Sequence, residues 1–166
     1  MPPILLIGIG SEYRSDDGAG LAAIRALKVR ELPGTLAIES PSDGAELMEL
    51  WKPADKVILI DAVSSGGVPG TVFRFDAHSQ PIPASLSFLS THTFGLAEAI
   101  ELARALHLLP QYLVVYAIEG HNFSIGTGLS REVEKAVQEV VEKVACEVHA
   151  LTLQQESIMK RVGNNS

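Results

Sequence analysis

Three acidic side chains stand where predicted β-strands end. Asp17 follows the loop after the apolar run Ile4–Ile9, while Asp61 and Glu119 each close a further strand. In sheets of parallel strands, ligands bind outside the carboxyl ends of the strands. His92 follows a loop of roughly fifteen residues, which is long enough to reach the same edge. We therefore predict that the side chains of Asp17, Asp61 and His92 converge there.

Two carboxylates and one imidazole support two kinds of hydrolytic site. With a divalent cation they form a three-ligand site of oxygen and nitrogen donors with open coordination positions. Without a metal, one carboxylate acts as a general base on water and the other as a general acid. The set has one nitrogen and no sulfur, so it fits a metal that arrives with the substrate better than a permanently bound one. Both interpretations predict hydrolysis.

Each of these residues also has a structural interpretation. Asp16 stands at the N-cap position of a predicted helix, and we expect its carboxylate to face the amides of that helix. The helix dipole would stabilise a carboxylate at the position of Asp17, near the N-terminus of the helix. This structural role and a catalytic role are equally consistent with the sequence. Asp61 follows four apolar residues, where burying a charge is costly, and this favours a functional role. His92 has the position to cap its own helix, and His121 has no clear partner.

The elements that must position these residues alternate between strands and helices. We predict strands at residues 4–9, 36–38, 57–60, 71–75 and 112–118, and helices at residues 17–28, 45–51, 94–106 and 130–153. This alternation is typical of an α/β fold whose helices cover both faces of one sheet. The first and third strands are apolar throughout, which only a strand covered on both faces tolerates. We expect them to be neighbours inside a twisted, mostly parallel five-stranded sheet.

Length and composition exclude several classes of protein. The 166 residues fit a single domain at residues 1–153 with a flexible C-terminal tail at residues 154–166. The one cysteine, Cys146, excludes a disulfide framework and a cysteine-based zinc or iron–sulfur site. A net charge of −7 argues against nucleic acid or an anionic membrane as partner. We expect a soluble cytoplasmic protein, because neither a signal peptide nor a membrane-spanning run is apparent.

The glycines after the first strand match a nucleotide-binding fingerprint only in part. Gly8-Ile9-Gly10 begins like a dinucleotide fingerprint, but Tyr13 stands where the third glycine belongs. The acidic pair Asp16 and Asp17 would repel a pyrophosphate at the helix N-terminus. Walker, nucleophile-elbow and H-E-x-x-H motifs are absent from the sequence. We therefore expect no organic cofactor.

A series of short motifs resembles the [NiFe]-hydrogenase maturation endopeptidases. The matching segments are Gly8-Ile9-Gly10 with Arg14-Ser15-Asp16-Asp17-Gly18-Ala19-Gly20, Gly44-x-Glu46-Leu47, Ile60-Asp61-Ala62 with Pro69-Gly70, His92-x-x-Gly95-Leu96, and Glu119-Gly120 with Phe123-x-x-Gly126-x-x-Leu129-Ser130. They follow the family's order and spacing. The last stretch is most similar to the branch that serves bidirectional, NAD(P)-linked hydrogenases.

The resemblance implies an aspartyl-type endopeptidase that clips a C-terminal extension from the nickel-loaded hydrogenase large-subunit precursor. It also implies that Asp17, Asp61 and His92 contact nickel, which the substrate supplies. The sequence departs from the family at Ser11, where Asn is usual, and at Asp17, where many members carry Glu. Glu39 and the three residues after it replace an Asp-Gly-Gly-Thr-like turn.

Two other functions would use the same edge of the sheet. A non-catalytic metal-binding or assembly factor would hold the metal without cutting, and a small-molecule binder would use the loop around Gly8 and Gly10. Incubation with a nickel-loaded precursor separates the first from an endopeptidase, because only an enzyme leaves a shortened product. Nucleotide titration addresses the second.

Overall fold

Five strands form one twisted sheet in the computed structural model, which describes residues 2–40, 44–83 and 95–165. The spatial order is β2-β1-β3-β5-β4. The strands are β1 (Ile4–Ile9), β2 (Thr35–Ser40), β3 (Lys56–Val63), β4 (Val72–Asp76) and β5 (Tyr112–Glu119). All neighbouring pairs are parallel except β4 and β5, which are antiparallel. The predicted α/β fold with a mostly parallel five-stranded sheet is confirmed.

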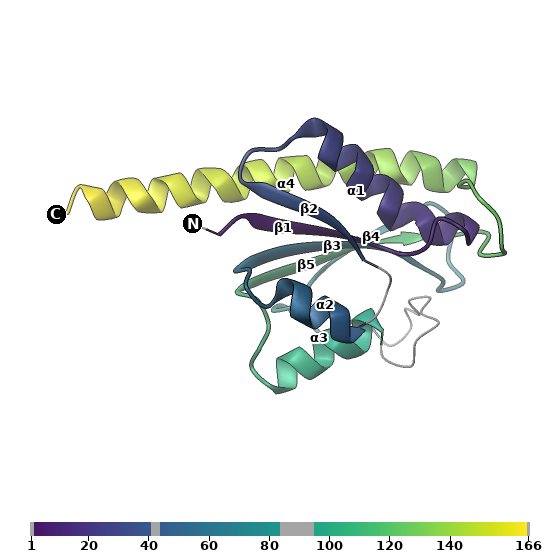
Figure 1. Ribbon diagram of the computed structural model, residues 1–166, viewed down its shortest axis with the longest axis horizontal. Coiled ribbons are helices and arrows are strands. Elements are labelled where there is room, and N and C mark those ends of the chain that lie inside the picture. The colour runs from purple at the N-terminus through teal and green to yellow at the C-terminus, as the bar shows by residue number, and fades with distance from the viewer. Residues whose placement is uncertain (1, 41–43, 84–94, 166) are drawn as a thin grey trace.

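Two layers of helices cover the sheet (Figure 1). The short 3-10 helix η1 (Ser15–Gly18) leads into α1 (Ala19–Arg30), which packs with α4 (Arg131–Gly163) on one face. The opposite face carries α2 (Gly44–Trp51) and α3 (Leu96–Ala105). Because both faces are covered, β1 and β3 are buried along almost their whole length, and they lie side by side in the middle of the sheet. This confirms the predicted pairing.

Close packing of α1 against the strand ends depends on glycine. A Cβ atom on Gly20 would collide with the carbonyl oxygens of Ile9 and Ile60, and one on Gly8 would collide with the carbonyl oxygen of Gly20. The start of α1 therefore lies directly on the carboxyl ends of β1 and β3. This contact brings the segment that contains Asp17 next to the end of β3.

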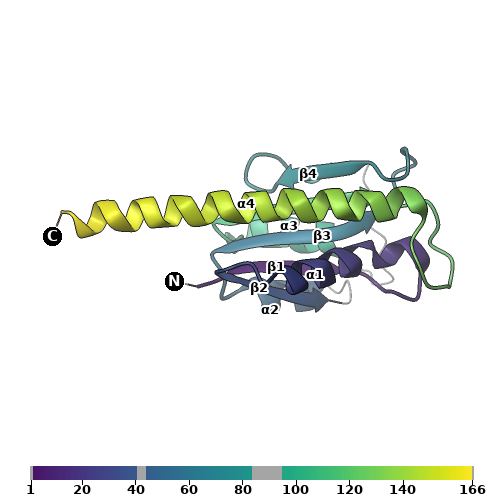
Figure 2. The same ribbon diagram turned by 90° about the horizontal axis from the view of Figure 1, so that it is seen from above.

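Two elements run further than the sequence predicts. β3 continues to Val63, because Ala62 and Val63 extend its pairing with β5, so Asp61 lies two residues before the end of the strand. α4 continues to Gly163 instead of ending at Leu153. Figure 2 shows this helix projecting beyond the sheet. Residues 154–163 are mostly exposed, but they include the good helix formers Gln, Glu, Met, Lys and Arg, which extend a helix that is already nucleated.

No helix in the described ranges is long and apolar enough to cross a lipid bilayer.

Replacing Gly20 tests the contact between α1 and the sheet. The Gly20→Ala variant should lower the free energy of unfolding by about 1–3 kcal/mol, because its methyl group displaces α1 from two backbone carbonyls. Urea unfolding at pH 7 measures the change. Gly163→Ala is the matched control, since nothing lies within 4 Å of that position, and it should leave stability unchanged or slightly higher. Equal stability of Gly20→Ala and the wild type would contradict the close contact.

Candidate functional site

Asp17 has a carboxylate of which only one oxygen is satisfied. The residue lies in η1 and is 7% exposed. Its Oδ2 accepts a hydrogen bond of 3.1 Å from the backbone N–H of Ser11. Its Oδ1 is buried and has no hydrogen-bond partner among the described residues. Burial raises the pKa of Asp17, while the Ser11 amide and the charge of Arg14 oppose that rise.

Gly10 shapes the turn that places Asp17. Its φ is +139°, a conformation that side chains rarely adopt, and a Cβ atom here would collide with the carbonyl oxygen of Asp17. The backbone at Gly10 therefore passes directly beneath Asp17. This explains why the loop after β1 requires glycine at this position without any nucleotide being bound.

Asp61 is the second carboxylate of the site and is 2% exposed. Its Oδ1 accepts a hydrogen bond of 2.8 Å from the backbone N–H of Ala62. Burial raises the pKa of Asp61 well above its usual value, and the nearby charge of Asp17 raises it further. The two carboxylates are thus electrostatically coupled, and such a pair retains a proton or attracts a cation. The structure places Asp17 near enough for its charge to act on Asp61, while the roles of both residues in the site stay predictions.

His92 lies outside the described residues, so its convergence with the two aspartates stays a prediction. Within residues 2–40, 44–83 and 95–165, no group of three His, Cys, Asp or Glu side chains is placed to hold a metal ion. The described part of the site is therefore the carboxylate pair.

Asp16 does not cap its own helix, so that prediction is wrong. Its carboxylate is fully buried and points to the loop after β5. Oδ2 accepts hydrogen bonds from the backbone N–H groups of His121 (2.9 Å) and Asn122 (2.8 Å) and from the hydroxyl of Ser130 (2.7 Å). Oδ1 accepts one from the backbone N–H of Ser130 (2.7 Å). These donors are distant from Asp16 in the sequence, so local helix-capping patterns do not predict them.

The hydrogen bonds decide the ionisation of Asp16. Burial alone would raise its pKa, but the donors from Asn122, Ser130 and His121 outweigh that effect and the pKa is lowered. Asp16 is therefore a charged anchor that holds the loop before α4 against η1. Adjacent aspartates in the sequence have opposite environments in the fold.

Two further acidic residues named from the sequence have structural partners. Glu119 lies at the predicted edge and is 2% exposed, but its carboxylate accepts hydrogen bonds from the backbone N–H (2.9 Å) and hydroxyl (2.6 Å) of Ser65. It holds the loop between β3 and β4. Glu39 forms ion pairs with Arg25 (2.6 Å) and Lys28 (3.8 Å) of α1. Neither carboxylate joins the pair of Asp17 and Asp61.

Ser40 is a buried polar residue that the sequence motifs did not indicate. It ends β2 beside Ile9, and its hydroxyl is buried without a hydrogen-bond partner among the described residues. The backbone N–H of Gly10 donates to its carbonyl oxygen at 3.2 Å. The signal that could have identified it is its position as a polar residue at the carboxyl end of a strand.

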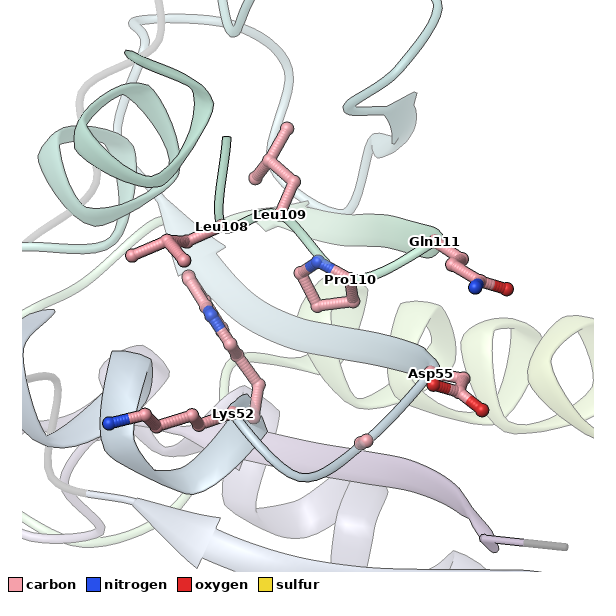
Figure 3. Close-up of a pocket in the computed structure, with 8 residues that line it drawn as sticks. Lys52, Asp55, Leu108, Leu109, Pro110 and Gln111 are labelled. Atoms are coloured by element: carbon pink, nitrogen blue, oxygen red, sulfur yellow. The ribbon is translucent and has the colours of Figure 1, made fainter. Parts of the chain in front are cut away.

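A cavity of about 190 Å³ lies at the amino ends of β3 and β5, opposite the strand ends that carry the candidate site (Figure 3). Its polar lining residues Lys52, Asp55 and Gln111 come from the segments that precede β3 and β5. The catalytic candidates lie at the other ends of these strands. The cavity therefore has no part in the candidate site.

Removing the charge of Asp16 tests the anchor. Asp16→Asn should lower the free energy of unfolding at pH 7 by about 2–3 kcal/mol, because an amide nitrogen cannot accept the bonds that the carboxylate receives. A lowered pKa stabilises the fold above the unfolded value near 3.9, and this contribution is lost as the pH falls through the folded value. The difference between wild type and variant should therefore shrink below about pH 4.

Urea unfolding between pH 3 and pH 7 measures this difference. Asp76→Asn is the control, because the carboxylate of Asp76 accepts one local, exposed hydrogen bond, and the change should alter stability by less than about 0.5 kcal/mol. An Asp16→Asn variant as stable as the wild type at pH 7 would show that the carboxylate anchors nothing.

Comparisons with known proteins identify the family of this chain. The family model HycI, described as hydrogenase maturation protease, matches residues 23–147. The chain is 28% identical over 120 residues to hydrogenase expression/formation protein HupD from Thiocapsa roseopersicina, a match that covers 71% of this chain and 54% of that protein. It is 28% identical over 145 residues to the hydrogenase 2 maturation protease of Escherichia coli, covering 85% and 87% of the two chains.

A solved structure shows the same fold. The [NiFe] hydrogenase maturation protease HybD from Thermococcus kodakarensis superposes with a TM-score of 0.70 and 27% sequence identity, over 88% of this chain and 99% of that one. The family model covers well over half of the chain and includes Asp61. The chain therefore belongs to the hydrogenase maturation protease family.

Proposed function

We propose that this protein is the endopeptidase that removes a C-terminal extension from the nickel-loaded large-subunit precursor of a [NiFe] hydrogenase. The observation that carries the proposal is the buried pair of Asp17 and Asp61, in which Oδ1 of Asp17 has no hydrogen-bond partner among the described residues. A buried anion that lacks partners is costly. A cation that docks against the pair removes this cost, and membership of the family supports a hydrogenase precursor as its carrier.

Nickel is part of the substrate in this proposal and not a cofactor of the protein. Asp17 and Asp61 offer oxygen donors, and His92 would add one nitrogen. Such a donor set has little selectivity for nickel, because nickel sites usually draw on more nitrogen or sulfur. The precursor therefore supplies most of the nickel ligands, and docking completes the shell. The metal then reports that the precursor is loaded and ready for cleavage.

The carboxylate pair supports hydrolysis in two ways. In both, the oxygen of water bonds to the scissile carbonyl carbon, the C–N bond breaks, and the leaving nitrogen gains a proton. In the first way, docked nickel holds both carboxylates ionised and fixes the scissile bond beside them. In the second, the pair shares a proton in the absence of metal, one carboxylate acting as base and the other as acid. A comparison of loaded and unloaded precursor separates them.

The sequence supports two finer assignments. The stretch from Glu119 to Ser130 resembles the branch that serves bidirectional, NAD(P)-linked hydrogenases, and we assign the substrate to that branch. We also place the protein in the cytoplasm, where its single, exposed and unpaired Cys146 would remain reduced.

Asp61→Asn separates catalysis from stability. The variant keeps the oxygen that accepts from Ala62 but loses the charge, so precursor cleavage should slow by at least about 100-fold. A raised pKa stabilises the protein below the unfolded value, and this contribution is lost as the pH rises through the folded value. The variant should therefore be more stable than the wild type at pH 7.5, by about 1–2 kcal/mol, and the two should converge near pH 4.

Gel assays of precursor shortening and urea unfolding at both pH values measure these effects. The control is Asp55→Asn, because Asp55 is exposed and lies at the amino end of β3, away from the candidate site. This substitution should alter neither activity nor stability. Wild-type cleavage by Asp61→Asn would exclude Asp61 as a charged ligand or base.

Nickel in the precursor should decide whether it is cut. Chelator-treated protein mixed with nickel-loaded precursor should release the extension, and the same protein mixed with nickel-free precursor should not. Purified protein should carry little metal, because two carboxylates and one imidazole bind free nickel weakly. Equal cleavage of loaded and nickel-free precursor would favour the metal-free pathway and show that nickel is not the signal.

A further inference from the structure

Two large apolar side chains are exposed beside the carboxylate pair. Tyr13, in the loop between β1 and η1, is 66% exposed, and Ile125, in the loop between β5 and α4, is 88% exposed. Arg14 follows Tyr13 and is also exposed. We call these three residues the loop surface. Large apolar groups that gather next to a catalytic site mark a place where another molecule docks.

The backbone beneath the loop surface is fixed. The N–H of Gly126 donates to the carbonyl oxygen of Tyr13 (2.9 Å), and the N–H of Ser15 donates to the carbonyl oxygen of Gly126 (3.0 Å). Arg14 and Gly126 form a parallel β-bridge, which places Tyr13 and Ile125 directly before the two bridge partners. The hydroxyl of Ser15 also donates to the carbonyl oxygen of Ser124 at 2.8 Å. A surface held in this way loses little conformational entropy when it binds.

Arg14 forms no ion pair within the part of the chain that the structure describes, although its charge acts on Asp17. Among the other arginines, Arg25, Arg30, Arg74 and Arg104 form ion pairs with glutamates, whereas Arg131 and Arg161, like Arg14, form none among the described residues. Arg14 forms none with the described residues, although the protein carries a net charge of −7. Its guanidinium lies close enough to Asp17 to act on that carboxylate. An exposed guanidinium that forms no ion pair with the described residues is suited to bidentate binding of a carboxylate.

We infer that the loop surface docks the large-subunit precursor, with Arg14 binding an acidic side chain of the precursor and with Tyr13 and Ile125 packing on apolar side chains around it. The inference rests on the proposed function. Tyrosine and arginine are common among the residues that dominate binding energy in interfaces. The loop surface is rigid and adjacent to Asp17, so its partner group must stand at a fixed distance from the scissile bond. A side chain of the folded precursor meets this requirement, whereas the free end of a C-terminal extension does not.

Steady-state cleavage of nickel-loaded precursor tests this surface. Arg14→Gln and Ile125→Ser should each raise KM by about fivefold or more, because docking contacts made equally in the ground and transition states affect KM. For Ile125→Ser, kcat should stay within about twofold. Arg14→Gln also removes a charge that acts on Asp17, so its readout is KM and the salt dependence of KM. The wild-type KM should rise with salt, and Arg14→Gln should lose much of this dependence. Arg161→Gln on the projecting end of α4 and Val29→Ser on α1, which is 84% exposed, are matched controls and should leave KM unchanged.

The outcomes separate this inference from the proposed function. If the wild type cuts the precursor but Arg14→Gln and Ile125→Ser keep its KM, or lower kcat alone, the loop surface does not dock the precursor and the proposed function stands. If the wild type leaves a nickel-loaded precursor intact, the proposed function is wrong and this inference falls with it.

Discussion

Two carboxylates buried side by side constrain the rest of this structure. Asp17 and Asp61 are almost completely withdrawn from water, burial raises the pKa of both carboxyls, and the charge of Asp17 raises the pKa of Asp61 further. Left to relax, such a pair would separate or become solvated. The packing of Gly20 on the strand ends prevents this, and the turn at Gly10 fixes Asp17 from below. The fold thereby holds two carboxylates in an electrostatically unfavourable environment at the carboxyl ends of the strands. A cation bound there would stabilise their ionised forms.

Adjacent residues show how environment selects the role of a carboxylate. Asp16 receives four hydrogen bonds and has a lowered pKa, so it is a stable anion that joins two loops. Among the described residues, the carboxylate of Asp17 receives one hydrogen bond and its Oδ1 has no partner, and its pKa is raised. The anchor and the reactive group are interdependent, because the loop that Asp16 holds includes Gly126, which pairs with the backbone around Arg14. Asp16, a structural carboxylate, and Asp17, a candidate functional carboxylate, thus occupy consecutive positions in the sequence.

Patterns local in sequence predicted the sheet, since long apolar runs such as Ile4–Ile9 have few alternatives to a central strand. They also indicated two carboxylates at the carboxyl ends of the parallel strands, and the structure buries both, while the convergence with His92 stays a prediction. The partners of Asp16 were not predictable in this way, because its bonds to Ser130 link residues 114 positions apart. The buried hydroxyl of Ser40 likewise depends on packing. The end of α4 was missed because the buried stripe stops at Leu151 while the helix-forming residues continue.

The central claim is that Asp17 and Asp61 titrate as one coupled, buried pair, and the most direct test is a carboxyl-carbon NMR titration of selectively labelled protein. We expect one of the two carboxyls to stay protonated well above the ordinary aspartate value near pH 4. Replacing Asp17 by Asn should lower the pKa of Asp61, because a neighbouring negative charge is removed. If both carboxyls titrate independently near pH 4, the two charges are neither buried nor coupled in solution, and the account of the site is wrong.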